Sequence, residues 1–379
     1  MIAMSGSVED GSIPVSSPVV DQLFEAVLAF RLGRPTRHAV IAGGFGAGKS
    51  YALSRAAEVA REGELRVAVL ERGPLGMSSY ADFLVEVAKA TQPAVLTRTE
   101  ADGWRSELLR KSSDLDERLR ATRVTEKKRK EAVAELVSRE LREIERRVID
   151  GSPGLVVVVE SIDQLLHQLR ATDRPRLVDL LTKARPNLLI LGSVHGTGLA
   201  DELGARVEFL QAAYLPTIEA GAALALQEAR RLGADRPKIT DRLKRAASAL
   251  ESTVKSNWLF WALVGRYLVV ARCEPLRWAE QDLRSRAAGH FDAMLLTLAP
   301  SEQRILLALA EAGGPRTVGE LADTIGVRNQ AAATALGRLL TDDWVRVVEV
   351  PSEPDRRRTW YDIADPMLRL HLLPGQRSK

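Results

Sequence analysis

Residues 43–50 read Gly-Gly-Phe-Gly-Ala-Gly-Lys-Ser, which fits the pattern G-x-x-x-x-G-K-S of a phosphate-binding loop. Apolar residues 39–42 precede the loop and helix-prone residues 51–57 follow it, as this pattern requires. Glycines let consecutive backbone N–H groups surround phosphate oxygens, and a helix N-terminus adds partial positive charge. The stretch therefore predicts a phosphate site between a strand and a helix, rather than a chance glycine turn.

The residue types within the loop indicate a nucleotide with its metal ion. Lys49 can reach the β- and γ-phosphates, and the Ser50 hydroxyl can ligate Mg²⁺. The predicted cofactors are therefore ATP and Mg²⁺. The predicted nucleotide contacts are Gly43, Gly44, Gly46, Gly48, Lys49, Ser50 and Tyr51.

Composition restricts the classes of protein that need to be considered. A chain of 379 residues, 45% hydrophobic and 27% charged, predicts two or three globular domains. It contains no apolar run near the roughly 20 residues of a membrane span and no secretory signal, so we expect a cytoplasmic protein. The single Cys273 excludes an intramolecular disulfide and a cysteine-based zinc site. The net charge of +4 permits nucleic-acid binding but does not by itself indicate it.

Apolar strands that alternate with helical segments predict an α/β fold. The β-branched run at 155–159 is typical of a parallel strand buried on both faces, and 65–70, 188–193 and 207–210 are further strands. A helix is expected from Pro18, with an apolar face that includes Val20, Leu23, Phe24, Val27 and Leu28. The expected organisation is a flexible tail at 1–16, a P-loop ATPase core at 17–215, a helical lid at 216–290 and a winged helix-turn-helix at 296–373.

Residues 103–149 form a charged insertion in the predicted core. Apolar residues at helical spacing, among them Val137, Leu141 and Ile144, predict one or two long exposed helices. Residues 126–131 are entirely charged. A solvated helical face and a projecting arm that binds a partner protein or nucleic acid are both compatible with this pattern.

A carboxylate at the end of a neighbouring strand completes the predicted ATP site. Glu160 directly follows the valine-rich strand and could hold Mg²⁺ through water. The segment 159–165 resembles the Walker B motif of AAA+ and STAND ATPases, especially those of the origin-recognition type and archaeal-type ATPases with winged-helix tails. The resemblance implies that Glu160 and Asp163 are the acidic positions near the metal.

Ser161 departs from that family pattern, because a glutamate that activates the attacking water usually stands there. A shifted alignment would make Glu160 the base and leave Val159 at the metal position, which is chemically worse. Serine is a poor general base at neutral pH. We therefore expect an ATPase that binds ATP well and hydrolyses it slowly or with help from a partner.

The resemblance also implies two sensor residues. Ser193, at the end of the strand at 188–193, matches the polar sensor 1, and His195 is an alternative. Arg266 lies where the family often has a sensor 2 arginine in the lid. The predicted catalytic residues are therefore Lys49, Glu160, Ser193 and Arg266, and the predicted metal ligands are Ser50, Glu160 and Asp163.

The C-terminal pattern of three helices and a β-hairpin predicts a winged helix-turn-helix. It resembles the winged helices of MarR-like regulators and, at residues 361–369, the tail of archaeal-type ATPases. The second helix of such a motif lies in the major groove, and the wing meets phosphates or the minor groove. The predicted DNA contacts are Arg328, Asn329, Gln330, Thr334, Arg338, Arg356, Arg357 and Arg358.

Three functions fit these features. We favour an ATP-binding AAA+-like protein that acts on double-stranded DNA as a nucleotide-controlled switch or oligomerising factor, in genome maintenance, mobile-element activity or defence. One alternative is an ATP-switched scaffold in which the winged helix and residues 103–149 bind proteins. The other is a nucleotide-responsive transcription regulator. The pattern also allows a homo-oligomer, and it predicts no membrane partner.

Overall fold

The protein is described by a computed structural model that covers residues 18–70, 77–92, 97–150, 153–196, 199–235, 237–270, 274–349 and 358–373. The predictions for the N-terminal tail and for Cys273, Arg356 and Arg357 lie outside these described residues. None of the described helices is both long enough and apolar enough to cross a membrane.

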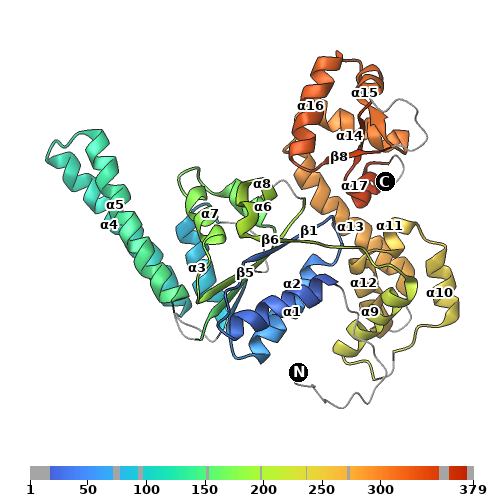
Figure 1. The fold of residues 1–379 in the computed structure, drawn as a ribbon, viewed down its shortest axis with the longest axis horizontal. Coiled ribbons are helices and arrows are strands. Elements are labelled where there is room, and N and C mark those ends of the chain that lie inside the picture. Colours follow the sequence, from blue (N-terminus) through green and yellow to red (C-terminus); the bar gives the residue numbers. More distant parts are fainter. Residues whose placement is uncertain are drawn as a thin grey trace.

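A six-stranded sheet forms the centre of the N-terminal half, in the order β3-β2-β4-β5-β1-β6 (Figure 1). Five strands are parallel, and the short β3 pairs antiparallel with β2. The strand bounds are β1 Ala39–Ala42, β2 Arg66–Leu70, β3 Thr91–Gln92, β4 Leu155–Val159, β5 Leu188–Val194 and β6 Glu208–Gln211. The predicted parallel α/β sheet is therefore confirmed.

The register of the sheet brings three loops together at one edge. Val159, the last residue of β4, pairs with Gly192 of β5, and Ala42, the last residue of β1, pairs with Val194. Parallel strands that end side by side place the segments after them next to one another. The loop at 43–50, Glu160 and His195 therefore lie at the same edge of the sheet.

Helices cover both faces of the sheet because alternate residues of a strand point to opposite sides. In β4, Val156 and Val158 pack with helices α1 (Pro18–Arg31) and α2 (Lys49–Glu62). Leu155, Val157 and Val159 pack in the second cluster. This cluster also contains residues of α3 Tyr80–Ala90, α4 Arg98–Ala121, α5 Glu126–Ile149, α6 Ile162–Gln168, α7 Arg174–Thr182 and α8 Leu199–Leu203.

Helix α1 begins at Pro18 as predicted, but its apolar face differs in one position. Val20, Leu23 and Val27 are buried against the sheet, whereas Leu28 is 52% exposed. Phe30 is buried instead. The prediction that Leu28 belongs to the buried face was wrong, because the helix turns this position away from the sheet.

The charged insertion is a hairpin of the two long helices α4 and α5, which extends away from the body of the molecule (Figure 1). The first helix begins at Arg98, five residues before the expected start of the insertion. Thr97 caps it, since its hydroxyl accepts a hydrogen bond from the Glu100 N–H while the Glu100 carboxylate accepts one from the Thr97 N–H.

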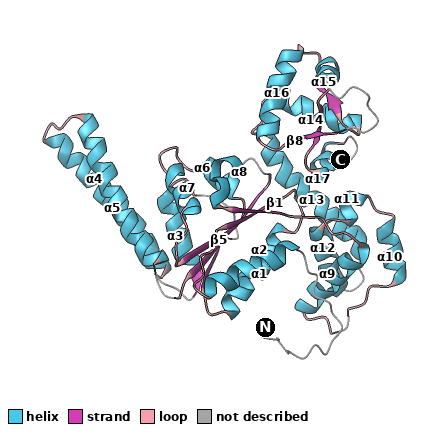
Figure 2. Cartoon of the chain, viewed as in Figure 1, coloured by secondary structure: helices cyan, strands magenta, loops and turns pink. Residues whose placement is uncertain are grey.

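The C-terminal half is helical apart from one small sheet, as the secondary-structure colouring makes clear (Figure 2). After the short helix η1 (Gly204–Arg206), the lid consists of α9 Ile218–Arg231, α10 Asp241–Ser248, α11 Ser252–Lys255, α12 Trp258–Val269 and α13 Pro275–Leu295. The winged helix consists of α14 Pro300–Ala312, β7 Arg316–Thr317, α15 Val318–Ile325, α16 Asn329–Thr341, β8 Val345–Val348, β9 Trp360–Ile363 and α17 Pro366–Leu372. Its sheet has the order β7-β9-β8.

The lid and the winged helix share one apolar cluster. Phe291 of α13 is fully buried together with Ile305 of α14 and Met367 and Leu370 of α17. This shared core fixes the winged helix against the long helix α13, so the two parts pack as one unit.

Candidate nucleotide site and nucleic-acid surface

A cavity of about 500 Å³ lies between the phosphate-binding loop and the lid. Residues of the loop and of α2 form its floor, the ends of β4 and β5 form one wall, and α9, α12 and α13 close it from the lid side. Of the predicted site residues, the cavity is lined by Gly46, Gly48, Lys49, Ser50, Tyr51, Glu160, Ser193 and Arg266. Tertiary structure thus brings together residues from four separate parts of the sequence.

Two glycines allow the lid to contact the loop closely. Gly46 and Gly48 have φ values of +72° and +89°, which favour glycine. A Cβ atom on Gly46 would lie 2.2 Å from the Asn257 side chain, and one on Gly48 would lie 2.9 Å from Trp258. The Asn257 Nδ2 donates to the Phe45 carbonyl at 3.1 Å, and the Trp258 N–H donates to the Gly46 carbonyl at 2.9 Å. The loop conformation is therefore held from the lid side.

Lys49 is partly buried in the loop and lies near three carboxylates. Its Nζ donates to the Gly43 carbonyl and, at 2.8 Å, to the Gly44 carbonyl. Burial lowers the pKa of Lys49, while the negative charges of Asp365, Asp163 and Glu160 oppose this shift. A partly buried cation beside glycine N–H groups is chemically suited to an anionic phosphate.

A carboxylate from the winged helix reaches the same loop. Asp365, which is only 3% exposed and directly precedes α17, accepts a hydrogen bond from the Phe45 N–H through Oδ2 at 2.6 Å. Its Oδ1 accepts from the Met367 N–H at 2.8 Å and so caps α17. A Cβ atom on Gly44 would lie 2.8 Å from Asp365 Oδ2, so the approach also needs glycine at that position. One buried carboxylate therefore joins the winged helix to the phosphate-binding loop.

Two histidines lie beside this contact. His195 Nε2 is 3.6 Å from Asp365 Oδ2, and the ring centroids of His195 and His290 are 5.8 Å apart. Burial lowers the pKa of His195, and it lowers the pKa of His290 to about 4, so both rings are neutral at pH 7. His290 comes from α13, lines the cavity, and its buried Nε2 has no hydrogen-bond partner among the described residues.

The segment after β4 is tied to the end of β5. The Ser161 N–H donates to Ser193 Oγ at 3.1 Å, and the His195 N–H donates to Asp163 Oδ2 at 3.0 Å. Ser161 has a φ value of +57°, which is uncommon for a residue other than glycine. These bonds fix the positions of the predicted acidic and sensor residues relative to each other. Their catalytic roles stay predictions.

The metal-ligand role of Ser50, Glu160 and Asp163 stays a prediction. In the described part of the chain, no three His, Cys, Asp or Glu side chains are grouped so that they could hold a metal ion. Asp163 Oδ1 is buried without a hydrogen-bond partner in this part, and its Oδ2 holds the backbone of His195. With Ser50, Glu160 and Asp163 as the predicted protein ligands, a Mg²⁺ ion would take its other ligands from water and phosphate oxygens, which is the usual way this ion binds.

Arg266 lies in the cavity but binds within the lid. Its Nε is 3.2 Å from Glu228 Oε1, and Glu228 also pairs with Arg231. This part of the cavity also contains an aromatic pair, since the rings of Tyr51 and Trp258 stack with centroids 5.2 Å apart. Stacked aromatic faces suit a planar base.

The helix α16 presents the predicted DNA-reading residues to solvent. Arg328 directly precedes the helix, and Asn329, Gln330, Thr334 and Arg338 are exposed on it. Ala332, Leu336 and Leu339 face the core. Of the predicted wing arginines, Arg358 is described and exposed. Apart from Arg338, whose guanidinium is 3.5 Å from the Glu302 carboxylate of α14, the predicted contacts on α16 form no ion pair with the rest of the described domain.

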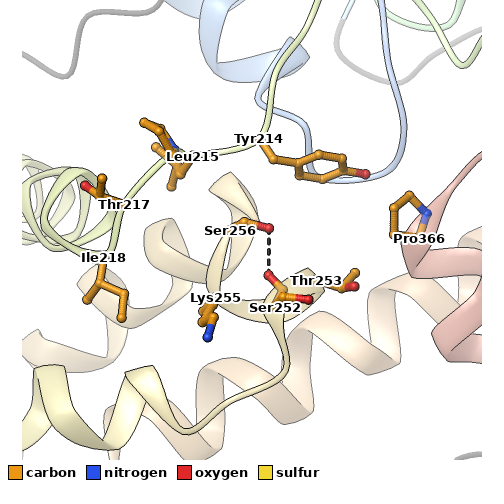
Figure 3. A pocket seen from close by; sticks show the side chains of 10 residues that line it. Tyr214, Leu215, Thr217, Ile218, Ser252, Thr253, Lys255, Ser256 and Pro366 are labelled. Atoms are coloured by element: carbon orange, nitrogen blue, oxygen red, sulfur yellow. Dashed lines mark hydrogen bonds between the residues drawn. The ribbon is translucent and has the colours of Figure 1, made fainter. Parts of the chain in front are cut away.

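A second cavity, of about 360 Å³, lies where the core, lid and winged helix meet (Figure 3). Tyr214 and Pro366 lie on one side of it, and Thr217 and Ile218 lie on the other. Ser252 and Ser256, which hydrogen bond at 2.7 Å, line its base. It is adjacent to the Asp365–Phe45 contact because Pro366 follows Asp365.

Several residues of the site were not predicted from the sequence. These are Asp365, Asn257, Trp258 and His290. Asn257 could have been found, because a helix-capping residue directly before an apolar helix is a local signal. Asp365 and His290 carry no such signal, since their positions depend on how remote helices pack.

The comparisons with known proteins agree with this architecture. A family model described as the MarR family matches residues 296–358. The solved structure of the Walker-type ATPase PABY2304 of Pyrococcus abyssi is similar over 93% of this chain and 94% of that chain, with 16% identity and a TM-score of 0.55. A comparison with curated proteins gave no match.

Two other solved structures are similar at lower TM-scores. They are the Aeropyrum pernix ORC1 protein in complex with DNA (TM-score 0.41, 16% identity, 96% and 94% of the two chains covered) and Cdc6p from Pyrobaculum aerophilum (0.42, 14%, 96% and 94%). The fold assignment depends on the Pyrococcus abyssi protein, whose TM-score exceeds 0.5. The chain has the fold of an AAA+-like P-loop ATPase with a C-terminal MarR-type winged helix.

Proposed function

We propose that the protein binds ATP with Mg²⁺ between the core and the lid, and that the bound nucleotide controls a winged helix acting on double-stranded DNA. The observation that carries the proposal is the hydrogen bond from the Phe45 N–H to Asp365. It joins the phosphate-binding loop, where we expect ATP to bind, to the winged helix, which we expect to bind DNA.

The residues present fit a nucleotide. The loop combines glycines that leave no room for a Cβ atom with a partly buried lysine and a helix N-terminus, which are the groups that hold phosphates in P-loop proteins. Tyr51 and Trp258 offer an aromatic face for the base. Bound Mg²⁺ would neutralise phosphate charge.

The Asp365 carboxylate competes with phosphate for the same loop. Two negative groups that share one N–H and one nearby lysine repel each other. A phosphate near Phe45 therefore favours withdrawal of Asp365, and an Asp365 that stays in place weakens phosphate binding. Asp365 directly precedes α17, and α17 packs in the apolar cluster that the winged helix shares with the lid. Withdrawal of Asp365 from the loop therefore moves the winged helix as well. By linkage, DNA binding and ATP binding then influence each other by the same factor.

Slow hydrolysis is consistent with this switch. Ser161 stands where the resembled ATPases usually have the glutamate that activates water, and serine is a poor general base at neutral pH. A nucleotide that persists keeps the winged helix in one state for longer than a rapidly cleaved one would.

The test measures duplex DNA affinity without nucleotide, with ATP and Mg²⁺, and with ADP and Mg²⁺. We expect ATP to change the affinity about 5-fold or more, a typical coupling between linked sites, and Lys49→Ala to abolish the change. ATP binding without any change in DNA affinity would overturn the switch. An absence of duplex binding at low salt would favour a protein-binding scaffold, and strong sequence preference would favour a transcription regulator.

A further inference from the structure

The tip of the α4–α5 hairpin carries a concentration of positive charge that the rest of the hairpin lacks. Residues 118–130 contain seven arginines and lysines and a single carboxylate, Glu126, which gives this segment a net charge of +6. The remainder of 98–149 has eight cations and eleven carboxylates, or −3. The net charge of the tip therefore exceeds that of the entire chain, which is +4.

Part of this charge is already neutralised within the hairpin. Asp116 binds Arg129 at 2.6 Å and Arg120 at 3.1 Å, and Glu126 binds Lys130 at 2.6 Å. Four other exposed cations of the tip each form no ion pair with a carboxylate of the described residues. These are Arg118, Arg123, Lys127 and Lys128.

Those four cations lie on both sides of the turn that joins the helices. Arg118 is in the last turn of α4, Arg123 is in the connection, and Lys127 and Lys128 are in the first turn of α5. The residues that join the two helices are largely exposed, as is each of the four cations. The geometry thus places like charges together at the far end of an arm of roughly 36 Å, at 1.5 Å per residue of helix.

The base of the hairpin is fixed to the core by buried and ionic contacts. The buried guanidinium of Arg66 in β2 donates to the Val148 carbonyl at 3.1 Å and to the Ile149 carbonyl at 3.0 Å, where α5 ends. Glu145 binds Arg185 at 2.5 Å and accepts from Tyr80 at 3.0 Å. A firmly held base means that the tip has a defined position, so a partner would not have to order the arm on binding.

We propose that the tip of the hairpin, Arg118, Arg123, Lys127 and Lys128, is a second DNA-binding surface that contacts the phosphate backbone of duplex DNA. Clustered, unpaired cations release counterions when they neutralise phosphates, which favours binding without reading sequence. The tip offers Arg and Lys and no Asn, Gln or aromatic group, so it suits the backbone rather than the bases. This surface lies away from the winged helix, at the other end of the molecule in Figure 1.

The experiment compares two variants that each remove four charges. R118Q/R123Q/K127Q/K128Q changes the tip, and R139Q/R142Q/R146Q/R147Q changes exposed arginines on the shaft of the hairpin, in α5. Binding of the full-length protein to a short mixed-sequence duplex is measured between about 50 and 200 mM salt. We expect the tip variant to bind about 10-fold more weakly at low salt and its log–log salt slope to fall by roughly 2 to 4. The shaft variant is expected to stay near the parent.

The same measurements in a winged-helix background separate the two surfaces. N329A/Q330A/R338A weakens the proposed winged-helix contact and leaves the hairpin unchanged. If the tip substitutions still reduce the residual binding there, the hairpin inference holds even when the winged-helix proposal fails. Equal salt slopes for the tip variant and the parent would overturn the proposal that the hairpin tip binds DNA. Binding to anionic phospholipid vesicles that depends on the tip, with DNA binding that does not, would also overturn it. Circular dichroism checks that both variants keep their helices.

Discussion

The Asp365 carboxylate and the Phe45 N–H are joined by a 2.6 Å hydrogen bond although the two residues are 320 positions apart in the chain. Asp365 uses both oxygens, since its other one caps α17 through Met367. The residue thus contacts the phosphate-binding loop and the winged helix at once, and the first prediction concerns its charge.

Asp365→Asn should strengthen ATP binding. An amide has a single acceptor oxygen, so it can cap α17 or accept from Phe45 but cannot do both, and it has no negative charge to repel phosphate. A hydrogen bond to a charged group contributes about 1.5–3 kcal/mol, so we expect the Kd for ATP to fall about 10-fold or more. Titration calorimetry with Mg²⁺-ATP measures it. Asp362→Asn, which removes a carboxylate paired with Arg369 in the same module, is the control and should leave the Kd unchanged.

Ser161→Glu should raise the rate of ATP hydrolysis. The substitution restores a carboxylate at the position that holds one in the family, and general bases contribute roughly 10²- to 10⁴-fold to rate. We expect at least about a 10-fold increase in turnover, measured by phosphate release. Ser161→Gln has similar size and no base, so equal rates for the two variants would contradict the prediction.

Gly46→Ala should damage both stability and nucleotide binding. Its Cβ would lie 2.2 Å from the Asn257 side chain, and its φ of +72° disfavours alanine. We expect a loss of about 1–3 kcal/mol in the free energy of unfolding, measured with denaturant. Gly337→Ala is the matched control, because this glycine lies within α16 with open space around it. Alanine there should stabilise by about 0.5–1 kcal/mol, and a similar loss at both positions would count against the steric explanation.

His38 should make the fold sensitive to acid. The ring is 2% exposed, and its Nδ1 accepts a hydrogen bond from the Ile190 N–H at 3.1 Å, which requires an unprotonated nitrogen. Burial lowers the pKa of His38 to about 4 from 6.5 in the unfolded chain. The unfolded state therefore binds the proton first as pH falls. The contribution of His38 to the free energy of unfolding is fully present above pH about 6.5 and is lost toward pH 4, by up to about 3 kcal/mol.

The measurement for His38 is the midpoint of thermal unfolding between pH 7 and pH 4. His38→Gln keeps an acceptor for Ile190 without a titrating ring, so its midpoint should fall less over this range. His195 and His290, whose pKa values burial also lowers, add to the effect in both proteins. A pH profile identical in the parent and in His38→Gln would refute the role given to His38.

Much of the fold could be predicted because its signals are local. The valine run of β4 and the alternation of strands and helices predicted a parallel sheet, and that prediction is confirmed. The winged helix was equally predictable from its three helices and β-hairpin. The exposed Leu28 shows the limit of such patterns, because small differences in helix orientation decide which residue at the edge of an apolar face is covered.

The candidate site was predicted in part. Residues 46–51, Glu160 and Ser193 line one cavity, because the ends of parallel strands meet at one edge of a sheet; the predicted contacts Gly43 and Gly44 do not line it. Arg266 also lines it, yet its partner is Glu228 of α9, which depends on the packing of two lid helices.

The sequence by itself determined the phosphate-binding loop, the parallel sheet and the winged helix, since each is specified by residues adjacent in the chain. Only tertiary structure decided that Asp365 meets Phe45, that Asn257 and Trp258 hold the loop, and that the hairpin tip stands apart from the body. The physical reason is that such contacts depend on how buried apolar faces of remote helices fit together. That fit depends on the shapes of many side chains at once, whereas a motif depends on a few consecutive residues.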